Sequence, residues 1–203
     1  MAYSYILKYF GTNFRVCFYI NQSLMNAIND HYLVPEQQEG AEKNLQTHIT
    51  GLTVEDAEDM FVVAKERMLD INNWKKENPF FNAFILADAY GKEVYRPAHT
   101  GDYIHIKNGT EAWVHIDAIE YDDYPDINTE TMAIRIHPSP APQIHVDEDP
   151  YQINSAVSST IVVERLDRRL TAFYHGRNET IGGIAQQTDD AWQQLIASFL
   201  IFD

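Results

Sequence analysis

Cysteine is almost absent from this chain: Cys17 is the single one among 203 residues. One thiol cannot form an intramolecular disulfide, and no CxxC or Cys/His spacing is present that would hold a structural zinc ion. The sequence therefore predicts a protein of a reducing compartment, which we interpret as the cytoplasm. It predicts neither a metal site nor a cofactor.

Basic residues are also scarce, since 15 Lys and Arg stand against 30 Asp and Glu and give a formal net charge of −15. Such a chain repels the phosphates of nucleic acids and anionic membrane surfaces. No run reaches the ~18 apolar residues of a membrane span, and Lys8, Gly11 and Arg15 interrupt the apolar first segment, which predicts no signal peptide. We expect neither nucleic acid nor a membrane among the partners.

Catalytic fingerprints are missing as well. The sequence contains no nucleophile elbow, P-loop, Rossmann fingerprint or HExxH motif. No catalytic residue is therefore assigned, and the interpretation leans towards a protein that is not an enzyme.

What the chain does have is apolar and aromatic side chains, at 45% and 12% of the residues. This content is enough for a sizeable core, and the length fits one domain better than two. Residues 39–203 are expected to form a single α+β domain. Residues 1–38 are expected to form an N-terminal hairpin or extension, and the polar stretch 36–51 is predicted to be a connector that is helical in part.

Two amphipathic helices are predicted. The first begins after Thr53, a favourable N-cap residue, and ends near Trp74, with acidic residues in its first turn that complement the helix dipole. The second covers residues 191–202. Apolar residues recur at i, i+3 and i+4 in both, so each helix should bury one face: Ala57, Met60, Phe61, Ala64, Met68 and Ile71 in the first, and Trp192, Leu195, Ile196 and Phe199 in the second.

Segments rich in β-branched and aromatic residues lie between these helices. The predicted strands are 81–88, 93–95, 102–106, 111–121, 131–137, 159–166 and 169–175. The last two should form a hairpin around Asp167-Arg168, and 138–154 is predicted to be a long loop. The expected fold is α+β: an antiparallel, curved sheet of about six strands packed against a long helix and a C-terminal helix.

Three histidines lie on successive predicted strands. Asn108-Gly109 is a strong signal for a two-residue type I′ turn. Such a turn places His105 opposite Ala112 and His115 opposite Asp102, so the two histidines point to opposite faces of the sheet. This register predicts scattered histidines.

A loop that is one residue longer reverses this result, because side chains alternate along a strand with period two. His105, His115 and His137 would then converge, and a site of three histidines becomes the alternative.

The tight-turn register also predicts a pocket. It places Tyr103 and His105 on the same face as Val114, and polar groups inside an apolar cavity are typical of ligand sites. The alternative is a tyrosine and a histidine in the core with satisfied hydrogen bonds.

The segment HGRNE, His175 to Glu179, is expected to follow the last strand. Arg177 could bind an anion or a carboxylate there. The alternative is a network at the strand end in which Arg177 pairs with Glu179 or Glu164.

Two resemblances accompany these patterns. The segment Thr53 to Pro79, with Ile71-Asn-Asn-Trp74 at its end, is similar to the helix before the second strand in helix-grip proteins of the START and polyketide-cyclase type. That weak architectural resemblance implies a cavity between the sheet and the C-terminal helix, lined by residues such as Tyr103, His105, Val114, Trp192 and Leu195. The sequence segments RPAHTGDYIHI, STIVVER and HGRNE resemble those of an uncharacterised bacterial protein family. This resemblance implies a bacterial, cytoplasmic origin and no particular activity.

Three functional hypotheses follow. The first is non-enzymatic binding of a small, partly apolar ligand in a cavity between sheet and helix, for which the candidate residues are Tyr103, His105, Val114, His175, Arg177 and Trp192. The second is a module that meets a protein partner through a strand edge or the 138–154 loop. The third is an enzyme of unknown reaction that uses His105 or His175 as acid or base and Arg177 to bind an anion.

Overall fold

A computed structural model describes residues 31–74, 84–107, 111–142, 157–179 and 189–202 of the chain. These residues belong to one compact unit that begins at His31. Residues 1–30 of the expected N-terminal hairpin or extension lie outside the described residues, so the assignment of 1–38 stays a prediction.

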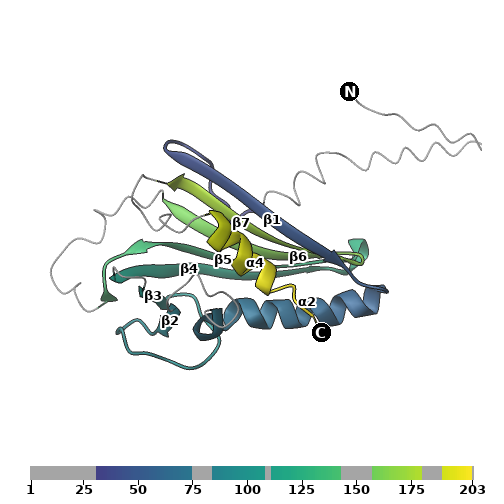
Figure 1. Ribbon diagram of the computed structural model, residues 1–203, viewed down its shortest axis with the longest axis horizontal. Coiled ribbons are helices and arrows are strands. Elements are labelled where there is room, and N and C mark those ends of the chain that lie inside the picture. The colour runs from purple at the N-terminus through teal and green to yellow at the C-terminus, as the bar shows by residue number, and fades with distance from the viewer. Residues whose placement is uncertain (1–30, 75–83, 108–110, 143–156, 180–188, 203) are drawn as a thin grey trace, which may run out of the picture. The chain divides into compact units, whose positions relative to one another are not determined.

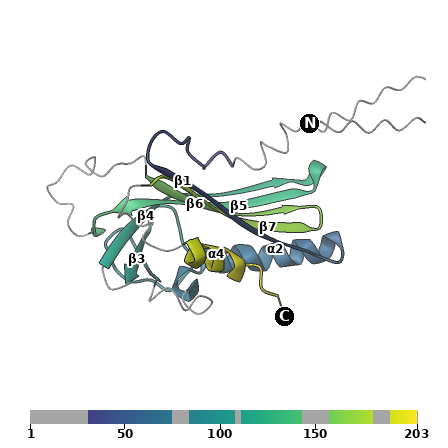
Figure 2. The same cartoon turned by 45° about the horizontal axis from the view of Figure 1, so that its top comes forward.

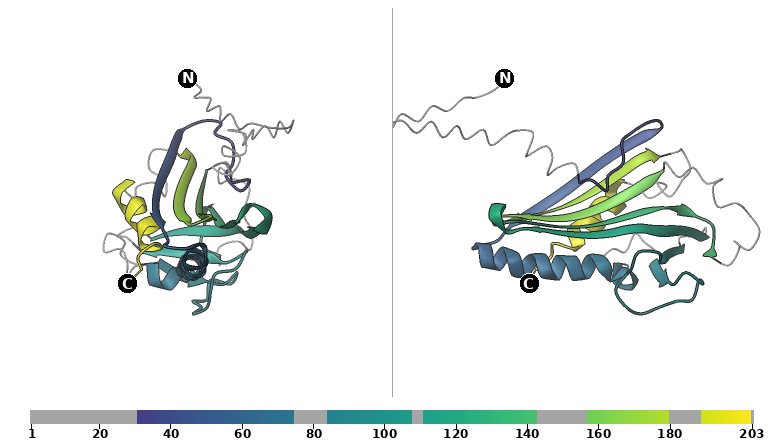
Figure 3. Two further views of the ribbon diagram at one scale, coloured as in Figure 1. Left: turned by 90° about the vertical axis from the view of Figure 1, so that its right-hand side faces the viewer. Right: turned by 180° about the vertical axis from the view of Figure 1, so that it is seen from behind.

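The described unit is built on one antiparallel sheet with the strand order β1-β7-β6-β5-β4-β3-β2. The sheet is curled, so that in the end view β1 and β7 stand steeply against the direction of β4 and β5 (Figure 3). This architecture confirms the α+β prediction. The strands are β1 (Ala41–Thr50), β2 (Phe84–Ala87), β3 (Tyr103–Lys107), β4 (Glu111–Tyr124), β5 (Thr129–Ser139), β6 (Ser158–Leu166) and β7 (Arg169–Glu179).

Strand β1 stands where the sequence predicted a partly helical connector, and that prediction is wrong. Its side chains alternate between half-buried and exposed, and Leu45 and Ile49 pack against the core. The alternation carries few strongly apolar residues, so it is a weak signal in the sequence. The strand forms because it pairs along its length with β7, far away in the chain, and tertiary pairing overrides local preference.

The other predicted strands are present with adjusted bounds. The β6-β7 hairpin turns at Asp167-Arg168 as predicted, with Leu166 paired to Arg169 and Asp167 in the left-handed region at φ 52°. The short strand expected at 93–95 is a single bridge between Ala87 and Glu93. Strand β5 extends into the predicted 138–154 loop, of which residues 143–154 lie outside the described residues.

Both predicted helices are present, and each ends a few residues earlier than predicted. The long helix α2 (Val54–Leu69) begins after Thr53, whose side chain and that of Asp56 form a capping box, and a single 3₁₀ turn (Ile71–Asn73) follows it. The C-terminal helix α4 covers Asp189–Ser198. Among the described residues, no helix has both the length and the apolar content needed to cross a membrane.

The main core lies between the helices and one face of the sheet. Figures 1 and 2 show α2 and α4 on the same side of the strands. The apolar stripes predicted for the two helices are buried there, except for the partly buried Met60, together with inward-facing strand residues. The large buried side chains of this core include Phe61, Trp74, Tyr174 and Trp192. On the opposite face a small second cluster contains Leu33, Ala133, Val162 and Phe173. The sheet therefore has a helix-covered face and an opposite face, and the candidate sites divide between them.

Candidate functional site

The register between β3 and β4 differs from the tight-turn prediction. Lys107 pairs with Glu111 and His105 pairs with Trp113, so three residues connect the strands. The two-residue turn at Asn108-Gly109 is therefore wrong, and the alternative loop that is one residue longer is correct. The pairing is shifted by one position from the tight-turn register, which exchanges the faces of all side chains on one strand relative to the other.

This register separates residues that were expected to share a pocket. Val114 is fully buried in the main core beside Ile104. Tyr103 and His105 point to the opposite face, where Tyr103 contacts the His115 ring with 4.8 Å between ring centroids. The pocket predicted from Tyr103, His105 and Val114 together is thus not formed.

The opposite face brings His115 and His137 together. They are direct partners in the β4-β5 ladder, and their ring centroids lie 5.2 Å apart. His105 shares this face but stacks on Trp113, with centroids 4.2 Å apart and an interplanar angle of 4°. All three histidines share a face, as the alternative predicted, but His105 is not part of the close group.

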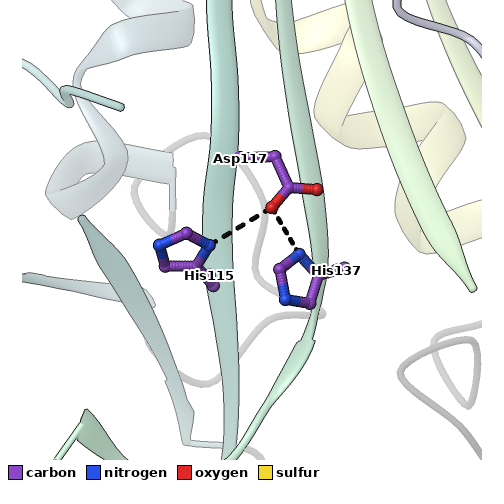
Figure 4. Close-up of side chains that lie close together, drawn as sticks. All are labelled: His115, Asp117 and His137. Atoms are coloured by element: carbon purple, nitrogen blue, oxygen red, sulfur yellow. Dashed lines mark hydrogen bonds and ion pairs between the residues drawn. The ribbon is translucent and has the colours of Figure 1, made fainter. Parts of the chain in front are cut away.

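Asp117 joins the two histidines because β4 contains a bulge. Ile116 pairs with Ile136 and Ala118 pairs with Arg135, which leaves Asp117 as the extra residue. A bulge of this kind re-aims side chains, and here it leaves Asp117 beside His115 on the opposite face (Figure 4). The sequence carried a signal for it: Ile116 and Ile119 both reach the core although they are three residues apart, which breaks the strand period of two.

The three side chains meet at one carboxylate oxygen. Oδ1 of Asp117 lies 3.2 Å from Nδ1 of His115 and 2.6 Å from Nδ1 of His137 (Figure 4). Oδ2 lies 3.4 Å from Nε of Arg135. Burial alone would raise the pKa of Asp117, but the hydrogen bonds from the two histidines and the charges of His137 and Arg135 outweigh it and lower that pKa. The carboxylate therefore stays ionised beside the two imidazole rings.

A second polar group lies on the helix-covered face. The hydroxyls of Ser159 and Tyr174 are 2.9 Å apart, and Tyr174 donates to Oε1 of Glu179 at 3.0 Å. Lys43 continues this chain to the surface, with Nζ 3.4 Å from Glu179 and 3.1 Å from Asp189 at the start of α4. We call these five residues the inner polar chain. Burial, together with the charge of Glu179, raises the pKa of Tyr174, so its hydroxyl remains a donor.

Two predicted candidates lie within β7 and not beyond its end, which corrects the expected end of the last strand. Nδ1 of His175 lies 2.8 Å from the side-chain oxygen of Asn44 on β1. Arg177 donates to the backbone oxygens of Lys43 and Gly176 and pairs with Glu42 at 3.5 Å. The structure shows these contacts in place of the pairing of Arg177 with Glu179 or Glu164 that was expected, because β1 lies beside β7.

The predicted candidate residues therefore fall into two groups. Val114 and Trp192 belong to the main core, and the Trp192 ring stacks on Tyr174 with centroids 4.4 Å apart. Tyr103, His105, His175 and Arg177 lie on the opposite face. A single ligand between the sheet and α4 cannot contact both groups. Tyr174 and Glu179 of β7 were not among the predicted ligand residues, and the contact of Lys43 with Glu179 depends on the unpredicted pairing of β1 with β7.

A groove lies at the other end of β1 from Lys43. It has a volume of about 440 Å³ and is open to solvent. Met60, Val63 and Phe202 supply apolar surface, while Asp56 and Asp59 supply acidic groups; Thr50, Gly51 and Leu52 complete the lining. It is separate from both polar groups described above.

No family model and no curated protein matches this chain. Solved structures with a similar arrangement include a point mutant of norcoclaurine synthase from Thalictrum flavum in complex with a transition-state analogue, at 10% identity and TM-score 0.38, covering 81% of this chain and 94% of that chain. A protein from Nitrosospira multiformis matches at 8% identity and TM-score 0.39, with 78% and 94% covered. A Mycobacterium smegmatis protein matches at 14% identity and TM-score 0.43, with 82% and 94% covered. These likenesses concern the arrangement of helices and strands alone.

Proposed function

We propose that this protein binds a small, partly apolar ligand between the sheet and α4 without catalysing a reaction on it. The observation that carries the proposal is the inner polar chain, which extends from the exposed Asp189 to the buried hydroxyls of Tyr174 and Ser159. Ligand sites are typically apolar surfaces with a few convergent polar groups. This end of the core has that composition.

Burial of the inner polar chain costs free energy unless its polar groups form hydrogen bonds. A carboxylate or hydroxyl removed from water costs free energy that hydrogen bonds only partly restore. The Ser159 hydroxyl has one partner, Tyr174, within the described residues, although a hydroxyl can both donate and accept. A ligand with one polar end could bond there, and its apolar body could pack against Trp192, whose ring stacks on Tyr174.

The strand-edge alternative has less support from the described contacts. β1 forms one edge of the sheet, and Gln193 of α4 donates to the backbone oxygen of Gln46 at 3.0 Å. An edge that is covered in this way and rich in polar side chains offers fewer free groups to an added strand.

The test uses the full chain, purified without added ligand or chelator. Native mass spectrometry should show an extra mass that is lost on denaturation. The neutral apolar dye Nile red should bind the ligand-free protein at one saturable site. Tyr174→Phe should weaken dye binding by about fivefold, the equivalent of one hydrogen bond, whereas Tyr121→Phe, an exposed tyrosine bonded to Glu130, should leave it unchanged.

Two outcomes would contradict the proposal. One is the absence of both a bound mass and saturable dye binding in a folded protein, as judged by near-UV circular dichroism. The other is dye binding that Tyr174→Phe leaves unchanged but Met60→Gln removes, because the ligand site would then be the open groove beside α2.

A further inference from the structure

The close group on the opposite face has the composition of a metal site. His115, Asp117 and His137 offer two imidazole nitrogens and one carboxylate oxygen that all lie within 4.8 Å of one another. We propose that these three side chains bind one divalent transition-metal ion, with Zn²⁺ as the best match to the donor set. This inference is independent of the ligand proposed for the helix-covered face.

The donor set fits the chemistry of zinc. Zinc binds imidazole nitrogen at ~2.0–2.1 Å and carboxylate oxygen at ~2.0–2.2 Å, usually with tetrahedral geometry, which keeps the donors about 3.3 Å apart. Oδ1 of Asp117 is already 3.2 Å and 2.6 Å from the two Nδ1 atoms. Small rotations of the two partly exposed rings therefore bring the donors to coordination distance. Calcium and magnesium are disfavoured, because they prefer oxygen ligands.

The backbone holds the donors in place before any ion binds. His115 and His137 face each other across two paired strands inside the sheet, where directly opposite Cβ atoms lie ~4.5–5.5 Å apart. The bulge at Asp117 adds the third donor from the same strand as His115. A site on strands is more rigid than one on loops, so little entropy is lost on binding.

The charges around the site and its exposure to solvent both affect the binding of an ion. Arg135 holds Oδ2 of Asp117 at 3.4 Å and leaves Oδ1 facing the histidines. Its positive charge opposes a cation, whereas the net charge of −15 on the whole chain favours one. The side chains of His115, Asp117 and His137 are 27%, 23% and 26% exposed, so solvent reaches them. Three protein donors leave a further coordination position for water.

The test measures Zn²⁺ binding by isothermal titration calorimetry. The full chain carries Cys17→Ser, which removes the one thiol, and is stripped with EDTA and desalted before titration. We expect one Zn²⁺ per chain. His115→Ala and His137→Ala should each weaken binding at least 100-fold. His137→Gln should do the same while conserving polarity and size, and all variants should retain the far-UV circular dichroism of the parent.

Two other histidines provide matched controls. His48 is an exposed histidine on β1, so His48→Ala should leave Zn²⁺ affinity unchanged. His105 shares the face with the site but stacks on Trp113, so His105→Ala should change affinity less than twofold. A parent protein that binds no Zn²⁺ at 100 μM would overturn the proposal. Binding that survives in a folded His115→Ala variant, or that disappears in His48→Ala, would also overturn it.

Discussion

The two faces of the sheet bury different kinds of side chain. On the helix-covered face, residues such as Ile116 and Ile136 are at most 1% exposed and lie among apolar neighbours. On the opposite face, the adjacent residues His115 and His137 are about a quarter exposed and contact a carboxylate. Consecutive residues of one strand therefore differ: the isoleucine is buried in the core and stabilises the fold, while the histidine beside it is accessible to solvent.

The two faces contribute differently to stability because the helices cover only one of them. Apolar area that α2 and α4 remove from water contributes roughly 25 cal/mol per Å², and this contribution depends on close packing. Polar side chains on the other face that keep contact with water, such as His115 and His137, contribute little to stability. The strongest candidates for binding at the surface thus lie where substitution should cost the fold least.

The largest expected effect contrasts two consecutive residues of β5. Ile136→Ala should lower the free energy of unfolding by about 2–5 kcal/mol, because it leaves a cavity in the main core. His137→Ala should change it by less than about 1 kcal/mol in metal-free buffer. Urea denaturation at pH 7 measures both values. Similar losses for the two variants would show that the opposite face is as important for stability as the helix-covered face.

The next largest effect on stability is expected from Glu164, a buried polar residue on the opposite face. Glu164 of β6 is 5% exposed, and its Oε2 has no hydrogen-bond partner among the described residues. Burial raises the pKa of Glu164 from 4.5 to about 7, an effect that the charge of Arg169 only partly offsets. The folded state then binds the proton more tightly than the unfolded state.

The sign of the pH dependence follows from this shift. The stabilisation is complete below pH 4.5 and is lost as the pH rises through about 7, at a total cost of about 3 kcal/mol. Glu164→Gln should remove this loss and make the protein more stable than the parent at pH 8. Denaturation curves between pH 4.5 and 8 measure the difference. Parallel pH profiles for parent and variant would show that Glu164 is hydrated in the folded state.

The sequence predicted the helix-covered face well. The stripes on both helices, the N-cap at Thr53 and the β6-β7 turn all depend on local periodicity or on turn chemistry. Strand β1 could not be predicted in this way, because its apolar content is low and its partner β7 is distant. The position of Lys43 in the inner polar chain depends on that pairing, so its contacts with Glu179 and Asp189 were missed.

The register of β3 against β4 could have been predicted by weighing two signals against each other. The tight turn at Asn108-Gly109 would have placed Ile104 on the face opposite to Val114. The observed register pairs these two residues, and both are fully buried. Burial of several apolar side chains outweighs the preference of one turn dipeptide, because a slip by one residue exposes a whole face. The convergence of His115 with His137 depends on their pairing between β4 and β5, while His105 joins that face as a consequence of the β3-β4 register.

The smallest expected effect tests a feature that was visible in the local sequence. Oγ1 of Thr53 accepts a hydrogen bond from the backbone of Asp56 at 3.0 Å, and Asp56 Oδ2 accepts one from the backbone of Thr53 at 3.0 Å. Thr53→Ala should lower the free energy of unfolding by about 1 kcal/mol, whereas Thr53→Ser should cost only a few tenths. Urea denaturation distinguishes the two. Because α2 covers the main core, a loss well above 2 kcal/mol in Thr53→Ala would mean that the cap also positions the helix on the sheet. Equal losses for alanine and serine would assign the effect to the threonine methyl group and not to the hydrogen bond.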